Sequence, residues 1–351
     1  MRMKANSGLA NTAYFLIIVI AGGYVLSIGK TIIVPVIFAI IVAFLLYPIC
    51  RKLEAKKFPR ILAILTTMFG VALLLAGIIV LFTFLFSGLF EDLENFKIKI
   101  MATVKMALEW ISTVPMLQKS VEPVLKDGGA GLFNQFSTWI GNMLISSTEF
   151  IGYCGIVVIY TFLFLLYRSA FKKFILSWFK GSRFNEMEAM LYKFQKVTQS
   201  YFGGMFIAIF MIGTINSIGL FFIGVDNAIL FGFFASFLAI IPYIGTSIGS
   251  ILPALYALLN YDEIWKAIAV LVFFQGVQAL EGNFITPKIV GNQVSINPLV
   301  AIVALLVGGV FWGIAGMVLS LPLIAITRVL LDNFENTKPF AHLLSNKFSD
   351  D

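Results

Sequence analysis

The chain has little charge and few of the side chains that soluble enzymes use for chemistry. Only 12% of its 351 residues are charged, one is a histidine and two are cysteines, Cys50 and Cys154. Two cysteines within or beside apolar runs give no disulfide framework, and no metal-ligand cluster, P-loop or Cys-x-x-Cys motif occurs. The sequence therefore predicts neither an enzyme nor an ATP-driven pump, and it predicts no cofactor and no metal site.

Hydrophobic residues dominate instead. They make up 60% of the chain, and the mean hydropathy is +0.96, values that are typical of an integral membrane protein. The net charge of +7 comes from Lys and Arg residues that cluster beside apolar runs, where they indicate membrane orientation. We therefore expect a lipid bilayer around the chain and no nucleic-acid partner.

Apolar runs follow one another along the chain, at 9–29, 31–50, 61–90, 150–167, 197–225, 227–261, 264–287 and 289–327. A bilayer core of about 30 Å needs roughly 20 helical residues. The first five runs and the seventh therefore predict full membrane spans. The first run lacks a clear small-x-small cleavage site, so we expect it to remain as a helix.

The run 227–261 is broken at its middle by Pro242. Each half would be about 21 Å long as a helix, too short to cross the bilayer alone. Pro242 removes a backbone donor, while Gly245 and Gly249 permit a tight turn and close helix contact. The sequence therefore predicts a re-entrant hairpin that enters and leaves on one side, a feature that transporters commonly place at binding sites.

The last run, 289–327, contains Gly308, Gly309 and Gly313 at its centre. This run is predicted to enter the membrane from the cytoplasmic side and to return to that side, either as a second re-entrant hairpin or as two short full spans. The predicted fold class is an all-α polytopic membrane protein with about six full spans and one or two re-entrant helical hairpins.

Basic residues predict which side each connection occupies. The loop 51–60 and the segment 168–196 are rich in Lys and Arg, so both should be cytoplasmic. Both termini should lie on the cytoplasmic side of the bacterial inner membrane. A second cytoplasmic helix is predicted to begin at Asn185, which forms a capping-box pattern with Glu188. The predicted segments are two opening helices with a basic loop (1–60), the third helix (61–90), an extracytoplasmic helical insertion (91–149), the fourth helix with cytoplasmic amphipathic helices (150–200), a transport core with broken hairpins (201–332) and a cytoplasmic tail (333–351).

Polar side chains recur within the seventh run. They are Gln275, Gln278, Glu281 and Asn283, with Pro287 behind them. Steps of three residues put the first three on one drifting face of a helix. A carboxylate in an apolar run costs several kcal/mol unless it is paired or hydrated, so Glu281 is a functional candidate that could exchange a proton. The alternative is a Glu281 near the inner interface, capped by Lys288 or by water.

Other polar or broken positions at membrane depth complete the predicted solute pathway. They are Asn216, Pro242, Gly245, Gly249, Asn297 and Pro298. Exposed ends of half-helices would offer amide donors or carbonyl acceptors to a polar solute. For Asn216 a plain interhelical hydrogen bond is an equal alternative.

One short motif in the sequence is also found in hydrolytic enzymes. Residues 245–249 match the G-x-S-x-G nucleophile elbow, with Ser247 as the nucleophile. That motif needs a strand-turn-helix context and a base, and the one histidine, His342, lies in the tail beyond several spans. We therefore expect no catalysis at Ser247.

Four motifs together resemble the autoinducer-2 exporter family of bacterial membrane proteins. They are IPYIG at 241–245, EGNFITPKIVG at 281–291, INPL at 296–299 and GGVFWGIAGMVLSLPLIAI at 308–326. The resemblance covers nearly the whole chain and implies a multi-pass, homo-oligomeric transporter, with some relatives proposed to work as elevator-type pentamers. Its motif glutamate maps onto Glu281, and its motif prolines map onto Pro242, Pro287 and Pro298.

The predicted function is export of a small polar solute by alternating access. The resemblance divides the cargo between autoinducer-2, a quorum-sensing furanosyl signal, and Na⁺/H⁺ in an antiporter. For a polyol, the amides would bind hydroxyl groups while Glu281 accepts a hydrogen bond or a proton; in an antiporter Glu281 itself would exchange Na⁺ for H⁺. A different class remains open, a non-transporting membrane scaffold that supports envelope assembly through 91–149.

Overall fold

The computed structural model describes residues 7–90, 130–240, 245–261, 263–285 and 296–345. Helix accounts for almost all of these residues, and their β structure is limited to an isolated bridge between Ile296 and Ser345. The predicted all-α class is therefore confirmed over the described part of the chain. Most of the insertion at 91–149 lies outside it, as do Pro242 and Pro287.

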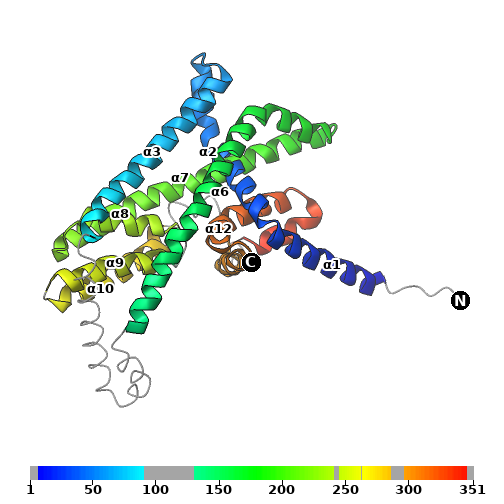
Figure 1. Cartoon of the computed structure of the whole chain (residues 1–351). Helices are drawn as coiled ribbons and strands as arrows, with labels where there is room; N and C mark the ends of the chain where they lie inside the picture. The colour runs from blue at the N-terminus through cyan, green and yellow to red at the C-terminus, as the bar shows by residue number, and fades with distance from the viewer. Residues whose placement is uncertain (1–6, 91–129, 241–244, 262, 286–295, 346–351) are drawn as a thin grey trace.

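Figure 1 shows the described helices in chain order. They are α1 (Ser7–Ile28), α2 (Lys30–Ala55), α3 (Arg60–Phe90), α6 (Ala130–Ser177), α7 (Ser182–Ile223), α8 (Ala228–Leu238), α9 (Gly245–Asn260), α10 (Ile264–Leu280), a π-helical turn (Glu281–Ile285), α12 (Pro298–Asp332), a 3₁₀ turn (Glu335–Thr337) and α13 (Lys338–Leu343).

Among the described residues, six helices are long and apolar enough to cross a membrane: α2, α3, α6, α7, α10 with its π turn, and α12. This number agrees with the predicted polytopic protein. The first run, predicted as a span, forms the 22-residue helix α1, and α12 is one of the six although it is folded in two. Helices α8 and α9 are among the shorter apolar helices.

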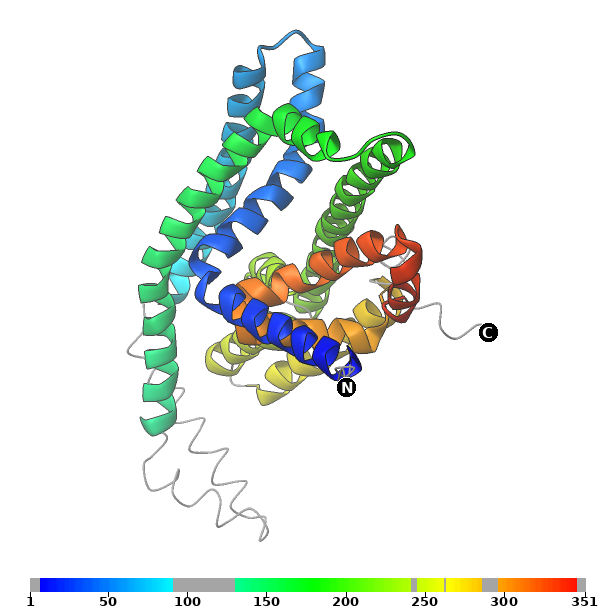
Figure 2. The same ribbon diagram turned by 90° about the vertical axis from the view of Figure 1, so that its right-hand side faces the viewer.

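The junction of α1 and α2 is a bend and not a loop. Gly29 alone separates them, with φ −73° and ψ 1°, close to helical values. Figures 1 and 2 show α1 running away from α2 at an angle. Two successive spans, as predicted for these runs, would require the chain to reverse between them, and no such reversal occurs at Gly29.

Helices α2, α3 and α6 pack into a bundle beside the rest of the molecule (Figure 2). Its buried apolar residues are Ala43, Leu46, Cys50, Ile64 and Leu165. At one end, Arg168 pairs with Glu54, and its guanidinium lies 4.9 Å from the centre of the Tyr47 ring. Arg60 donates to the carbonyl of Leu165 at 3.0 Å. These contacts connect α2, α3 and α6 at that end of the bundle.

Two helix boundaries differ from the sequence interpretation. Helix α6 begins at Ala130 and runs unbroken to Ser177, so residues 130–149 and the predicted amphipathic segment belong to one long helix. Helix α7 begins at Ser182, after Gly181 with φ 63°, so Asn185 lies inside the helix instead of capping it. Glu188 pairs with Lys172 of α6 at 2.6 Å, which explains its position without a capping box.

Candidate transport site

Helices α8 and α9 fold back on each other as an antiparallel pair, here called the first hairpin. At its open end the backbone N–H of Asp226 donates to the hydroxyl oxygen of Tyr261 at 2.8 Å. Further along, the rings of Phe231 and Tyr256 lie 5.0 Å apart. Contacts at both levels show that the two short helices run side by side, as the break in the sequence predicted.

Glycine lets the two helices approach closely near the closed end. A Cβ on Gly249 would lie 2.8 Å from the Cα of Ala235, and one on Gly245 would lie 2.5 Å from the backbone nitrogen of Ala239. Real Cβ atoms essentially never make contacts under 3.0 Å, so a larger residue would push α8 and α9 apart. Both glycines, predicted as pathway residues, thus have a packing role in the hairpin.

The nucleophile-elbow match at 245–249 lies in this hairpin. The structure places Ser247 in the first turn of helix α9, and the preceding element, α8, is a helix as well. A strand before the serine is what exposes the nucleophile in that motif. The motif match is therefore explained by the glycines that the helix packing requires.

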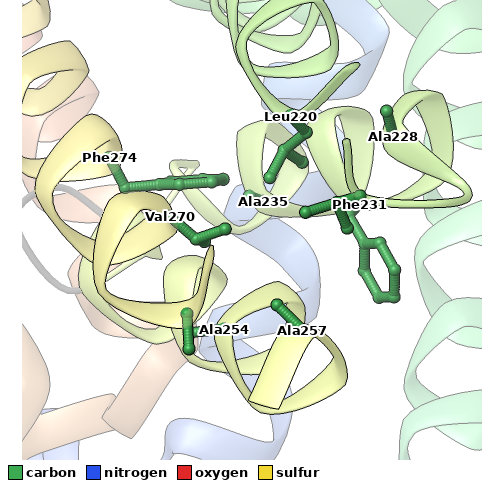
Figure 3. Close-up of a cluster of buried hydrophobic side chains, with 10 residues drawn as sticks. Leu220, Ala228, Phe231, Ala235, Ala254, Ala257, Val270 and Phe274 are labelled. Atoms are coloured by element: carbon green, nitrogen blue, oxygen red, sulfur yellow. The ribbon is translucent and has the colours of Figure 1, made fainter. Parts of the chain in front are cut away.

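A buried apolar cluster joins the first hairpin to α7 and α10. Figure 3 shows these side chains converging from four helices: Leu220 from α7, Phe231 and Ala235 from α8, Ala254 and Ala257 from α9, and Val270 and Phe274 from α10. Backbones also approach closely, because a Cβ on Gly232 would lie 2.5 Å from the backbone nitrogen of Ser217. We call the first hairpin, α7 and α10 together the hairpin block.

The closed end of the first hairpin reaches deep along α7. Helix α8 runs antiparallel to α7, and the ring of Phe233 lies 5.8 Å from that of Phe210. Phe210 precedes the end of α7 at Ile223 by 13 residues, which corresponds to about 20 Å of helix. The first hairpin therefore lies alongside about 20 Å of α7.

Helix α12 is also folded in two. Gly313, with φ 61° and ψ −141°, interrupts it. The halves 298–312 and 314–332 pack antiparallel, because the Ser320 hydroxyl donates to the Ala304 carbonyl at 2.8 Å. We call this pair the second hairpin, and it confirms that the last apolar run turns back at its glycine-rich centre.

The two hairpins open toward opposite ends of α7. The base of the second hairpin contacts the beginning of α7, where Val329 packs near Met190 and Ala325 packs against Tyr201. The first hairpin opens at the other end, where Val225 joins its apolar cluster. The closed ends therefore point in opposite directions along α7.

Contacts at both ends hold the second hairpin in place. At its closed end, the indole N–H of Trp312 donates to the carbonyl of Leu26 in α1 at 3.0 Å. At its base, the backbone N–H of Asn297 donates to the carbonyl of Leu344 at 3.0 Å, so the C-terminal segment lies against the start of α12. Trp312 is not among the site residues predicted from the sequence, although this residue directly precedes Gly313, which makes the turn.

Asn297 and Pro298 start the second hairpin. The Asn297 side-chain oxygen accepts a hydrogen bond from the backbone N–H of Leu299 at 3.0 Å, and Pro298 occupies the first helical turn. Asn and Pro are favoured at these two positions for the same reasons in many helices. Their presence in the motif is thus explained by helix capping, although both were predicted to line the pathway.

The predicted polar stripe of α10 does not face one direction. The buried face of the helix carries Val270, Phe274 and Val277. Glu281 continues this face by helical spacing and is half-buried, Gln278 lies beside it and is also half-buried, and Gln275 is exposed. Of the stripe, Glu281 is thus the side chain that shares the packed face of α10.

The chain around Glu281 departs from regular α-helix. Residues Glu281–Ile285 form a π-helical turn, a local expansion that is frequent at functional sites. The Asn283 side chain donates to the Ala279 carbonyl at 2.8 Å, so one of its two N–H donors is occupied by its own helix. Glu281 has no ion-pair partner in the part of the chain that the structure describes, and Lys288, the predicted capping residue, lies outside that part.

Asn216 lies in α7 on the face that meets α10. It is 1% exposed, and its side-chain oxygen has no hydrogen-bond partner within the described residues. One turn away, Ile212 packs in a cluster with Val277. The interhelical hydrogen bond considered from the sequence is therefore not made by this oxygen. We call the line formed by Asn216, Ile212, Val277 and Glu281 the α7–α10 seam.

Comparisons with known proteins agree with this architecture. The family model described as AI-2E family transporter matches residues 14–336. The chain is similar to the putative transport protein YueF of Bacillus subtilis, with 25% identity over 87% of this chain and 84% of the relative. It is also similar to the putative transport protein YrrI of the same organism, with 26% identity over 87% of both chains.

A third relative carries a substrate in its name. The AI-2 transport protein TqsA of Escherichia coli is 26% identical over 94% of this chain and 93% of its own length. Because the family model covers nearly the whole chain, and because the apolar helices and the glycine-rich turns lie inside the matched range, the chain belongs to the AI-2E family of transporters.

Proposed function

We propose that this chain carries a small polar solute across the membrane by alternating access, with the α7–α10 seam as part of the pathway. The observation that supports this most is Glu281, a carboxylate in a π turn on the packed face of a membrane-spanning helix, without an ion-pair partner among the described residues. Such a group is expensive in a bilayer and is retained where it contacts a solute or a proton.

The orientation that we propose follows from charge. Arg60, Arg168 and Lys172 lie at the end of the molecule where α6 meets α7, and basic ends face the cytoplasm. In this orientation α7 would run from the inside to the outside of the bacterial inner membrane, and the C-terminal tail would lie inside. The first hairpin then re-enters from outside and the second from inside, which supports a site between opposed hairpins.

The packing suggests which parts move. The hairpin block is joined by apolar and backbone contacts, whereas the α2–α3–α6 bundle has its own core and its own polar contacts. In the elevator mechanism implied by the family resemblance, we propose that the block slides against this bundle in each subunit of a homo-oligomer. The separate cores support this division, since rigid units are needed for a sliding motion.

The cargo that we favour is autoinducer-2, the substrate class in the name of the relative TqsA. Its hydroxyl groups would be bound by carboxylate and amide oxygens such as those of Glu281 and Asn216. The second candidate is Na⁺/H⁺ exchange, which the Glu281 carboxylate favours because it has no ion-pair partner among the described residues and because one carboxylate can bind either ion in turn.

Transport by reconstituted protein tests both candidates. We would measure Na⁺-driven proton movement across pH 6 to 9, and uptake of labelled autoinducer-2, in liposomes that contain the native chain or Glu281→Gln. An antiporter should lose all activity in Glu281→Gln. An autoinducer-2 carrier should lose proton coupling but keep some downhill transport.

Glu263→Gln is the matched control. Glu263 lies at the other end of α10, is exposed, and contacts Lys266 and Trp265 at the surface. Its replacement should leave either activity unchanged. Equal transport by the native chain and Glu281→Gln would remove Glu281 from the mechanism, and absence of both activities in the native chain would overturn both cargo assignments.

A further inference from the structure

We infer that Asn216 is a specificity-determining residue, whose side-chain oxygen accepts an electropositive group of the cargo, either a hydroxyl hydrogen or a sodium ion. The inference rests on the proposed transport function and extends it to a second position in the seam. It separates two roles that a buried asparagine in a membrane helix can have, a structural hydrogen bond between helices and a contact to the solute.

The position of Asn216 is unusual for a polar side chain. Its neighbours one turn before and after on α7, Ile212 and Leu220, are 1% and 0% exposed and belong to two apolar clusters. The first of these clusters faces α10 and the second faces both α10 and the first hairpin. Asn216 therefore lies where the two clusters meet, inside the hairpin block.

Buried hydroxyl groups on the same helix show what a structural role looks like. The hydroxyl of Ser217 donates to the Gly213 carbonyl at 2.7 Å, and that of Thr198 donates to the Phe194 carbonyl at 2.8 Å. The oxygen of Asn216 has no comparable contact in the described chain. A buried polar atom without a partner is costly, and it persists where a ligand or a water completes it.

Glu281 lies farther along the same seam. Helix α10 runs antiparallel to α7, with the ring of Phe273 against Gly219. Counting from this contact, Glu281 is level with position 211 of α7, which is about 8 Å along the helix axis from Asn216. The two side chains offer oxygen acceptors at successive depths, so the seam favours cargo that brings hydrogen-bond donors or positive charge and disfavours anions such as phosphates.

Replacing Asn216 by Leu tests this role because the Leu side chain has the same number of heavy atoms, branched at the same carbon, and no polar atom. If the Asn216 oxygen has no hydrogen-bond partner until the solute binds, Asn216→Leu should raise the melting temperature of the purified protein by about 2 °C or more. The reason is that the substitution removes a buried polar group without a partner. The same variant should transport autoinducer-2 or Na⁺ at least about tenfold more slowly, as expected when a hydrogen bond to substrate is lost.

Two further variants complete the experiment. Thr198→Val removes a buried hydroxyl that is 1% exposed and hydrogen-bonded within α7, so it should lower the melting temperature and leave transport unchanged. Asn216→Asp keeps the oxygen acceptor and should keep Na⁺ or autoinducer-2 transport above that of Asn216→Leu. Stabilisation of the protein by NaCl, against KCl, or by autoinducer-2 identifies which cargo the oxygen accepts.

A lower melting temperature for Asn216→Leu, like that of Thr198→Val, would show a structural hydrogen bond and overturn the inference. Native transport rates in Asn216→Leu would overturn it as well. If the native chain carries neither probe, the proposed function fails instead, and the direction of the melting shift still decides whether Asn216 is structural.

Discussion

Both hairpins reverse the chain direction, but different contacts hold them in place. The first is packed on both sides, by α7 and by α10, and its Gly232 meets backbone atoms of Ser217 in α7. The second is tight within itself, where a Cβ on Gly308 would lie 2.5 Å from the Gly316 carbonyl oxygen. Its closed end, however, is attached to the rest of the molecule through Trp312 and α1.

The first hairpin is therefore a rigid part of the hairpin block, whereas the second hairpin is attached to the rest of the molecule mainly at its two ends. Removing close backbone contacts in the first hairpin should disturb the hairpin block as a whole, because interiors are close-packed and transmit strain. Changes at the end of the second hairpin should instead act locally, because fewer groups depend on them. Three glycine and tryptophan substitutions test this contrast.

Gly232→Ala should destabilise the protein most. The new Cβ would lie 2.5 Å from the backbone nitrogen of Ser217, and neither backbone can move without opening α7 from α8. We expect the free energy of unfolding to fall by about 3 kcal/mol, at the upper end for overpacked sites, as a lower melting temperature in detergent. Gly276→Ala on α10 is the control, since nothing lies within 4 Å of its added Cβ. Equal melting temperatures would show that the block is loosely packed.

Local breaks were predictable from sequence, and directions in space were not. Helix α8 ends at Leu238 and α9 begins at Gly245, on either side of the break that was predicted at Pro242, and Gly313 interrupts α12, because proline and glycine act on the backbone wherever they stand. The spacing of Gln275, Gln278 and Glu281 was less informative. A step of three residues falls about 60° short of a full turn, so the first and third side chains differ by about 120°. This drift is why Gln275 is exposed while Glu281 follows the packed face.

Contacts between distant segments were beyond sequence reasoning. The hydrogen bond from Trp312 to Leu26 joins residues 286 positions apart, and the bond from Asn297 to Leu344 depends on where the tail returns. Asn216 illustrates the same limit, because its polar side chain was visible but its lack of a partner was not. A single sequence gives the side chain, whereas the partner depends on how helices pack.

Gly313→Ala should have an intermediate effect, at the turn of the second hairpin. Its φ of 61° lies in the left-handed region, which costs a residue with a Cβ about 1–3 kcal/mol. We expect a melting temperature between those of Gly232→Ala and the native chain. Gly309→Ala is the control: its added Cβ would meet the flexible end of Met317 at 2.6 Å, which can move aside. A drop as large as that of Gly232→Ala would contradict the contrast between the hairpins.

Trp312→Phe should have the smallest effect on stability and the most local one. Phe keeps an aromatic ring but lacks the N–H that donates to Leu26, a loss of about 1 kcal/mol. Hydrogen exchange should therefore rise in α1 and at the closed end of the second hairpin, while exchange in α8 and α9 stays unchanged. Trp265→Phe, which removes an exposed contact to Glu263 at 2.9 Å, should alter neither region. Faster exchange throughout the hairpin block would contradict the contrast and would mean that α1 also stabilises this block. A block that is held together by its own packing should not loosen when one hydrogen bond between Trp312 and Leu26 is lost.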